Sequence, residues 1–199
     1  MPWSDQAFDY LVSAFEFSTV LDIGAGTGQY ARRFREAGKV VYAIDQNPVP
    51  RDCAHRVLTG TLAELAPRLP WFDCVWCSHV LEHQHDPQAF LRSTVGRCRP
   101  GGVIAVSVPP QNGRIVSEHY TLWTTGLLLY HCVLAGLDCR EAAVWQYPHS
   151  CSLVTRVRFL DTDPGFMVPD LVRYMPSGVT LDNLGYDAGF ERRPGDAMR

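Results

Sequence analysis

The chain of 199 residues is 46% hydrophobic and 20% charged, with a formal net charge of −3. This length and composition fit one globular domain with a sizeable core, and the slightly acidic balance argues against the broad basic surface of RNA- and DNA-binding proteins. The sequence has neither an apolar run of the roughly 18 residues that a membrane span requires nor a signal-peptide pattern, so we expect a cytoplasmic protein without a membrane partner.

Predicted helices and strands alternate along the chain, which indicates a parallel sheet covered by helices on both faces. The alternation supports one domain over residues 1–160. Residues 161–199 contain four prolines and little periodicity, so we predict a C-terminal extension that is partly ordered or acts as a lid or dimerisation arm. The expected helices are 4–16, 29–37, 87–98 and 121–135, and the expected strands are 19–23, 40–45, 56–59, 72–77, 103–108, 138–145 and 151–159.

Seven cysteines are spread along the chain, and only Cys74 and Cys77 have C-x-x-C spacing. Both fall in a predicted strand, where side chains three positions apart point to opposite faces. We therefore expect these thiols to pack in the core as reduced side chains rather than to share a metal ion or a disulfide.

The turn after the first predicted strand is rich in glycine. Gly24, Gly26 and Gly28 stand at alternate positions after Asp22. Glycine adopts positive φ and lacks Cβ, so such a turn lets a ligand lie against bare backbone, and the N–H groups that begin the next helix would face an anionic group. A dinucleotide site requires G-x-G-x-x-G. The alternate spacing and the carboxylate of Asp22 instead favour a cofactor with an ammonium group, such as S-adenosylmethionine.

The motif D-x-G-x-G-x-G at residues 22–28 resembles the first motif of class I S-adenosylmethionine-dependent methyltransferases. Three later features resemble that family in order and spacing: Asp45 at the end of the second strand, the segment 72–83, and the turn 99–102. The resemblance is good over residues 18–110. It implies an α/β fold, a Rossmann-like doubly wound three-layer αβα sandwich with a mostly parallel seven-stranded sheet whose last strand is antiparallel, and it implies S-adenosylmethionine as cofactor.

The resemblance also implies roles for individual residues. The glycine turn would line the methionine part of the cofactor, with Asp22 near its amino group, and Asp45 would bind both ribose hydroxyls. The family often places an acidic residue after the third strand to contact adenine, whereas Thr61-Leu62 stands there in this chain and would flank the ring. Ser78 and His79 would lie near the transferred methyl group. The implied cofactor-binding residues are Asp22, Gly24, Ala25, Gly26, Gly28, Asp45, Gln46, Thr61, Leu62, Ser78 and His79.

Methyl transfer from a sulfonium depends mainly on in-line alignment of nucleophile, methyl carbon and sulfur, and it benefits from a general base. His119 follows the fifth strand, whose C-terminal end lies where ligands bind in a doubly wound sheet. We predict His119 as the base, with ordering of its loop as the alternative role, and His79 as a second catalytic candidate. Tyr120 and Trp123 would offer aromatic surface to the substrate.

The segment from His79 to Asp86 holds three histidines and two carboxylates, a composition that can bind a metal ion. In the resembled family this segment forms a wall of the cofactor pocket, so no metal site is predicted.

Together these features predict methyl transfer to an oxygen, nitrogen or carbon nucleophile of a small molecule. Two alternatives stay open: a methyltransferase that acts on a protein or RNA, and a non-catalytic relative that binds the cofactor and acts as an interaction protein. The expected partner is a small-molecule acceptor, with DNA excluded, RNA disfavoured and a homodimer left open.

Overall fold

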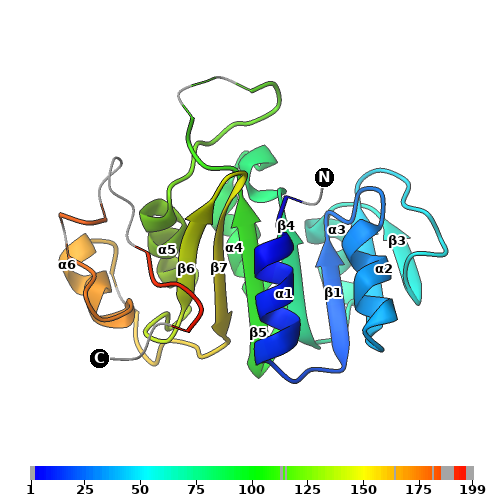
Figure 1. Ribbon diagram of the computed structural model, residues 1–199, viewed down its shortest axis with the longest axis horizontal. Coiled ribbons are helices and arrows are strands. Elements are labelled where there is room, and N and C mark those ends of the chain that lie inside the picture. Colours follow the sequence, from blue (N-terminus) through cyan, green and yellow to red (C-terminus); the bar gives the residue numbers. More distant parts are fainter. Residues whose placement is uncertain are drawn as a thin grey trace.

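Seven strands form one sheet in the order β3-β2-β1-β4-β5-β7-β6 in the computed structural model, which describes residues 3–112, 114, 116–163, 165–180, 182–184 and 191–195 (Figure 1). β7 alone runs antiparallel to its neighbours, and the other pairs are parallel. The predicted Rossmann-like sheet with an antiparallel last strand is confirmed. The strands are β1 (Thr19–Ile23), β2 (Val40–Asp45), β3 (Arg56–Thr59), β4 (Phe72–Ser78), β5 (Cys98–Val108), β6 (Ala143–Tyr147) and β7 (Ser150–Arg156).

Helices cover both faces of the sheet, which gives the three layers of the fold (Figure 1). α1 and α2 pack on one face, and α3, α4 and α5 pack on the other. Among the described residues, no helix has both the length and the apolar character that crossing a bilayer requires. The helices are α1 (Asp5–Ala14), α2 (Gln29–Glu36), α3 (Leu62–Leu65), α4 (Pro87–Val95), α5 (Thr125–Leu134) and α6 (Val168–Leu171), with 3-10 turns η1 (Ala66–Arg68), η2 (Leu81–His83) and η3 (Val172–Tyr174).

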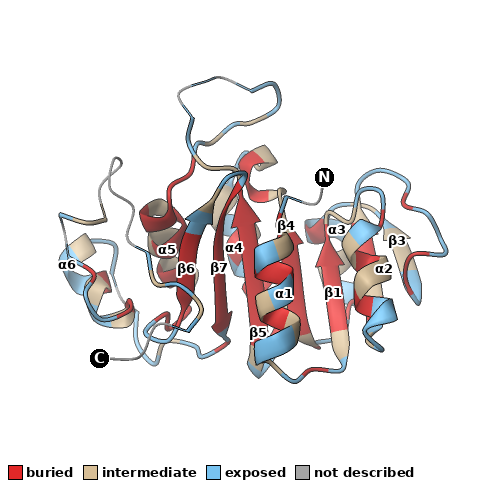
Figure 2. Ribbon diagram, in the orientation of Figure 1, coloured by how far each residue is buried: buried red, intermediate tan, exposed pale blue. Residues whose placement is uncertain are grey.

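The core lies on both faces of the central strands, which are buried along almost their whole length (Figure 2). Neighbouring residues of one strand face opposite ways, so Val20 packs with α1 and α2 while Leu21 packs with the helices of the other face. Cys74 and Cys77 divide in the same way, as predicted, and both are buried free thiols. Each fully buried large apolar side chain contributes about 1.5–3 kcal/mol to the stability of the fold.

Some predicted boundaries shift for local reasons. α5 begins at Thr125 rather than residue 121, because the Thr124 side chain accepts a hydrogen bond from the Leu127 N–H and so ends the preceding loop. β6 begins at Ala143 rather than residue 138, because the chain first turns at Cys139, whose carbonyl accepts the Ala142 N–H. The short α3–η1 segment at 62–68 was not predicted.

The C-terminal segment lies beside α5 at the β6 end of the sheet, far from β1–β3 (Figure 1). Leu171, Met175 and Val179 are buried in the main core, and Arg192 forms an antiparallel bridge with Val144 of β6. These residues therefore extend the core. The boundary near residue 160 and a role as lid or dimerisation arm stay predictions.

Candidate functional site

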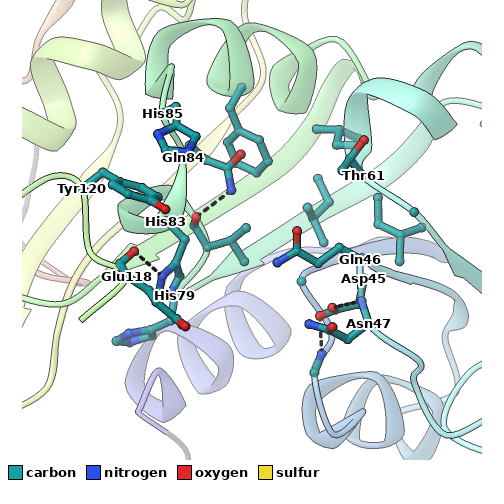
Figure 3. A pocket seen from close by; sticks show the side chains of 18 residues that line it. Asp45, Gln46, Asn47, Thr61, His79, His83, Gln84, His85, Glu118 and Tyr120 are labelled. Carbon is teal, nitrogen blue, oxygen red and sulfur yellow. Dashed lines mark hydrogen bonds between the residues drawn. The ribbon is translucent and has the colours of Figure 1, made fainter. Parts of the chain in front are cut away.

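A cavity of about 840 Å³ opens at the carboxyl ends of β1, β2 and β4. In the sheet, β2 and β3 lie on one side of β1, whereas β4 and β5 lie on the other side. The strand order therefore reverses at β1, and doubly wound folds bind ligands at such switch points. Figure 3 shows two opposed groups of side chains around the cavity. The strand-end wall consists of Gly24, Gly26, Asp45, Gln46, Asn47 and Thr61, and the histidine wall consists of His79, His83, Gln84, His85, Glu118 and Tyr120.

The glycine turn uses its own N–H groups inside the protein. Gly24 and Ala25 both donate to the Ile44 carbonyl, at 2.8 and 3.1 Å, and Gly26 donates to Oδ2 of Asp45 at 2.9 Å. A Cβ on Gly24 would lie 2.1 Å from Cγ2 of Val80, whereas a Cβ on Gly26 would meet no atom within 4 Å. The turn therefore offers a ligand open space at Gly26 rather than unpaired donors. Ala25 does not line the cavity.

Asp22 and Gly28 lie behind the turn. Asp22 is 2% exposed and does not line the cavity, and its Oδ2 has no hydrogen-bond partner among the residues that the structure describes. Burial, reinforced by the charge of Asp45, raises the pKa of Asp22 to about 7, and a hydrogen bond from the Ala31 backbone opposes this shift. Gly28 packs so closely that a Cβ would lie 2.5 Å from Cβ of Cys53. Both residues shape the turn from behind rather than from the ligand side.

Asp45 links the end of β2 to the glycine turn and lines the cavity. Its Oδ2 accepts the Gly26 N–H and its Oδ1 accepts the Asn47 N–H at 2.8 Å. A carboxylate has about four acceptor sites, so each oxygen keeps lone-pair capacity for a further donor. Two fixed oxygens with this capacity suit a pair of neighbouring hydroxyl groups. Gln46 and Asn47 flank Asp45 in the wall.

Thr61 and Leu62 also reach the cavity, at the start of α3. Thr61 forms a capping box with Glu64: the Glu64 N–H donates to Oγ1 of Thr61, and the Thr61 N–H donates to Oε2 of Glu64 at 2.8 Å. The Thr61 N–H and the Thr61 hydroxyl both donate to Oε2 of Glu64, and these two bonds lower the pKa of Glu64. The carboxylate of Glu64 beside this turn was not predicted, although Thr-x-x-Glu is the signature of such a cap.

His79 and Ser78 follow the carboxyl end of β4. His79 has a positive φ of 56°, which is rare for a non-glycine residue and frequent at functional sites. Its Nε2 lies 2.9 Å from Oγ of Ser150 and its Nδ1 lies 3.4 Å from Oε1 of Glu82. Because both ring nitrogens face protein groups, His79 is poorly placed to act as a base. Ser78 does not line the cavity, and its hydroxyl pairs with that of Ser4 at 2.8 Å.

The loop after β5 completes the histidine wall. The Tyr120 ring, 56% exposed, stacks on His85 with centroids 4.0 Å apart, and its N–H donates to the Glu82 carbonyl. His119 does not line the cavity, and its ring meets His83 edge-on at 4.8 Å. The predicted substrate role of Trp123 does not hold, because its ring is 1% exposed, packed in the core.

Several cavity residues were not assigned from the sequence. Asn47 and Phe90 belong to no motif that the sequence shows. Glu118 joins the wall through a contact between its carbonyl and Nδ1 of His83, which lies 35 residues earlier in the sequence. The histidines at 83 and 85 were visible as a cluster, but their orientation was not.

Comparison with known proteins places the chain in a family. A family model described as a methyltransferase domain matches residues 5–191. The chain is 32% identical over 104 residues to the ubiquinone biosynthesis O-methyltransferase of Vibrio vulnificus, covering 47% of this chain and 44% of that protein. It is 31% identical over 101 residues to the malonyl-[acyl-carrier protein] O-methyltransferase of Salmonella typhimurium, covering 48% and 40%. The chain thus spans less than half the length of these relatives.

The fold is shared with solved methyltransferase structures. The 1,6-didemethyltoxoflavin-N1-methyltransferase of Burkholderia thailandensis, solved with 1,6-didemethyltoxoflavin and S-adenosylhomocysteine bound, aligns with a TM-score of 0.63 at 23% identity over 78% of this chain and 80% of that chain. The family model covers nearly the whole sequence and agrees with the motif at the end of β1. The chain therefore belongs to the class I S-adenosylmethionine-dependent methyltransferase family.

Proposed function

We propose that the protein transfers a methyl group from S-adenosylmethionine to an oxygen or nitrogen of a small-molecule acceptor bound in the cavity at the carboxyl ends of β1, β2 and β4. The observation that carries this proposal is the division of one cavity into two chemically different walls (Figure 3). Its volume of about 840 Å³ falls in the range of small-molecule sites and leaves room for two ligands side by side.

The strand-end wall fits the cofactor. Asp45 offers two fixed carboxylate oxygens, one for each ribose hydroxyl, in the bidentate geometry that strengthens charged hydrogen bonds. Gly26 leaves open space in which the methionine part can lie against the backbone. Thr61 and Leu62 border the same wall at the start of α3, where they can flank adenine. Asp22 would act on the amino group through its charge from behind the turn.

The histidine wall fits the acceptor. When bound, S-adenosylmethionine supplies an activated methyl carbon, which forms a bond to the acceptor atom as its bond to sulfur breaks and the electron pair stays on sulfur. The wall then has to orient the acceptor in line and exclude water. The exposed face of Tyr120, backed by His85, gives a flat surface on which a planar acceptor can stack.

A base at this wall would accept the proton that the acceptor loses. Among the described cavity residues, His85 is the histidine whose ring nitrogens form no hydrogen bond in the structure, since those of His79 and His83 contact Ser150 and Glu118. We therefore favour His85 as the base, and the predicted role of His119 stays a prediction. His85→Gln should lower kcat while leaving the affinity for S-adenosylhomocysteine unchanged.

Calorimetric titration of the full chain with S-adenosylmethionine and S-adenosylhomocysteine tests the cofactor site. Asp45→Ala should weaken binding at least about tenfold, because the carboxylate bonds to the ribose hydroxyls are lost. Asp52→Ala is the matched control, since Asp52 is exposed and does not line the cavity. Absence of binding to the unaltered chain, or equal affinity of both variants, would contradict the proposal. A screen of planar hydroxyl and amine acceptors, with S-adenosylhomocysteine release as the readout, then tests turnover.

A further inference from the structure

A buried carboxylate behind the histidine wall lacks any hydrogen-bond partner. Glu82, in η2, is 0% exposed, and within the described residues neither of its carboxylate oxygens has a partner. A buried ionised group without a partner is strongly destabilising, so carboxylates in this position are paired with a cation or lose their charge. The groups that face Glu82 show which compensation fits.

His79 presents a lone pair to Glu82. The Ser150 hydroxyl donates its proton to the Trp3 carbonyl at 2.8 Å, so towards His79 it has only lone pairs. Nε2 of His79, 2.9 Å from that hydroxyl, therefore carries the ring proton. In the neutral imidazole the other nitrogen, Nδ1, is an acceptor, and it lies 3.4 Å from Oε1 of Glu82.

His83 does the same from the other side. Its Nδ1 lies 2.9 Å from the Glu118 carbonyl oxygen, which can only accept, so Nδ1 carries the proton. Its Nε2 lone pair then faces the same carboxylate oxygen of Glu82 at 3.8 Å. With both imidazoles neutral, two lone pairs and a carboxylate converge with no hydrogen atom between them, an arrangement that repels itself unless a positive charge joins it.

His119 brings a third imidazole to this cluster. One ligand atom from each of Glu82, His83 and His119 can be chosen so that all three lie within 4.8 Å of one another. The loop that carries His119 is fixed to η2, because the Tyr120 N–H donates to the Glu82 carbonyl at 2.8 Å. Residues far apart in the sequence are therefore held together by the backbone.

We propose that Glu82, His83 and His119 bind a divalent cation of the Zn²⁺ class, with Nδ1 of His79 as a further donor on the same side. Zn²⁺ binds imidazole nitrogen and carboxylate oxygen at about 2.0–2.2 Å, which places neighbouring ligands of a tetrahedral site about 3.3 Å apart. The 3.4 and 3.8 Å separations around Oε1 of Glu82 are close to that spacing. The nitrogen-rich donor set disfavours Mg²⁺ and Ca²⁺, which prefer oxygen. The geometry thus revises the prediction that the segment holds no metal.

The surroundings of the cluster match those of metal sites. The Glu118 carbonyl fixes the tautomer of His83, as the outer partners of metal-bound histidines do. His79 and His83 both line the cavity (Figure 3), so a cation that they help to bind would lie at the histidine wall. With Glu82, His83 and His119 as its three protein ligands, the cation would keep a fourth coordination position, which either Nδ1 of His79 or an acceptor oxygen can fill.

Binding of the metal alone to the full chain tests this inference. Protein treated with a chelator is titrated with Zn²⁺ against a coloured competitor and, separately, with Co²⁺, whose visible spectrum reports its ligands. We expect one equivalent to bind, and we expect Glu82→Gln and His83→Ala each to lower the affinity at least about tenfold. His149→Ala is the matched control, since His149 is exposed in the turn between β6 and β7.

Thermal unfolding supplies a second readout. Zn²⁺ should raise the Tm of the unaltered chain and of His149→Ala but not that of Glu82→Gln, because only a cation bound to the folded state stabilises it. Three results would overturn the inference: no stoichiometric binding, unchanged affinity in Glu82→Gln, or a Co²⁺ spectrum with thiolate charge-transfer bands, which would point to the cysteines. In the first case protons rather than a metal hold the cluster together. No cofactor or acceptor is present in these measurements, so their outcome is independent of the proposed methyl transfer.

Discussion

The two walls of the cavity differ in how completely the protein satisfies its own polar groups. In the strand-end wall, each carboxylate oxygen of Asp45 accepts a backbone N–H. Behind the histidine wall, both carboxylate oxygens of Glu82 are buried without a partner while two imidazoles approach. The carboxylate of the strand-end wall is thus paired before a ligand arrives, whereas the histidine wall is backed by a buried carboxylate that has no hydrogen-bond partner within the described residues.

The difference follows from how each wall is built. Parallel strands place the ends of β1, β2 and β3 side by side, so the turn at Gly26 and the carboxylate of Asp45 meet through the sheet itself. The histidine wall joins η2 to the loop after β5, and its contacts depend on individual side chains such as His83 and His119. A wall fixed by sheet geometry tolerates little change in its backbone, while a wall fixed by side chains can be altered one group at a time.

Gly24→Ala should cause the largest loss of stability, because Gly24 is where the two walls touch. Its φ of 73° costs a non-glycine residue about 1–2 kcal/mol, and its new Cβ would lie 2.1 Å from Cγ2 of Val80, the residue that leads into η2. Together with overpacking, we expect the free energy of unfolding to fall by about 2–5 kcal/mol. Urea unfolding followed by circular dichroism measures this loss.

Gly38→Ala is the control for that measurement. Gly38 has a similar φ of 76°, but its Cβ would meet no atom within 4 Å. Only the backbone cost of about 1–2 kcal/mol should remain. Equal losses in the two variants would show that the contact with Val80 is unimportant.

Asp22→Asn should stabilise the protein at neutral and higher pH. Burial and the neighbouring charge of Asp45 raise the pKa of Asp22 from 3.8 to about 7 in the folded state. Because the folded state holds this proton more tightly, the contribution of Asp22 is fully favourable below about pH 4 and is lost as the pH rises to about 7. Asparagine cannot ionise, so it escapes the cost of burying a charge, which we expect to be about 1–3 kcal/mol near pH 8.

The difference between variant and unaltered chain isolates this effect from other titrating groups. We expect the stability gain of Asp22→Asn to shrink steadily between about pH 7 and pH 4. A gain that does not depend on pH would mean that Asp22 is already neutral or that the unpartnered Oδ2 is paired in solution.

The contrast between the walls also explains what the sequence could predict. The positions of β1, β2 and β4 followed from apolar runs bounded by turn residues, because these strands are mostly buried and leave a strong local signal. The predicted start of β6 was five residues too early, at 138 instead of Ala143, since the pairing of Ala143 with Val154 that defines this start is a long-range contact.

The same limit applies to the site. Most of the residues assigned to the cofactor line the cavity, since strand ends in this topology converge there: Gly24, Gly26, Asp45, Gln46, Thr61, Leu62 and His79. Burial of Trp123 depends on how the loop after β5 packs on the core. The lone pair that His79 turns towards Glu82 depends on the contact between His79 and Ser150 of β7. No spacing rule in the sequence encodes such packing.

Ser150→Ala should change the free energy of unfolding by less than Gly24→Ala, through the histidine wall. The buried hydroxyl of Ser150 joins the Trp3 carbonyl to Nε2 of His79, so its removal leaves a donor and an acceptor unpaired and should cost about 1–2 kcal/mol. Loss of the hydroxyl also frees the His79 ring to change tautomer, which nitrogen chemical shifts in NMR spectra report.

Ser152→Ala separates these two effects. Ser152 is equally buried in β7 and bonds Ser107 at 2.6 Å, but it does not contact the histidine wall. It should lose similar stability while the His79 tautomer stays fixed. If His79 behaves identically in both variants, the Ser150 hydroxyl does not set its protonation.

Gly26→Ala should have the smallest effect on stability and a clear effect on binding. Its φ of 52° lies in the left-handed region, where alanine costs about 1 kcal/mol, and its Cβ would project into open cavity rather than into protein. If that space holds the methionine part of the cofactor, the added methyl group occupies it, and the affinity for S-adenosylhomocysteine should fall at least about tenfold.

Gly101→Ala is the matched control: its φ is 79°, no atom lies within 4 Å of its Cβ, and it lies outside the cavity. If Gly26→Ala and Gly101→Ala are equally stable but Gly26→Ala binds S-adenosylhomocysteine more weakly, the space at Gly26 serves a ligand. Gly24, two residues earlier in the same motif, differs because Val80 fills the space beside it. Unchanged affinity in Gly26→Ala would place the cofactor elsewhere along the strand-end wall.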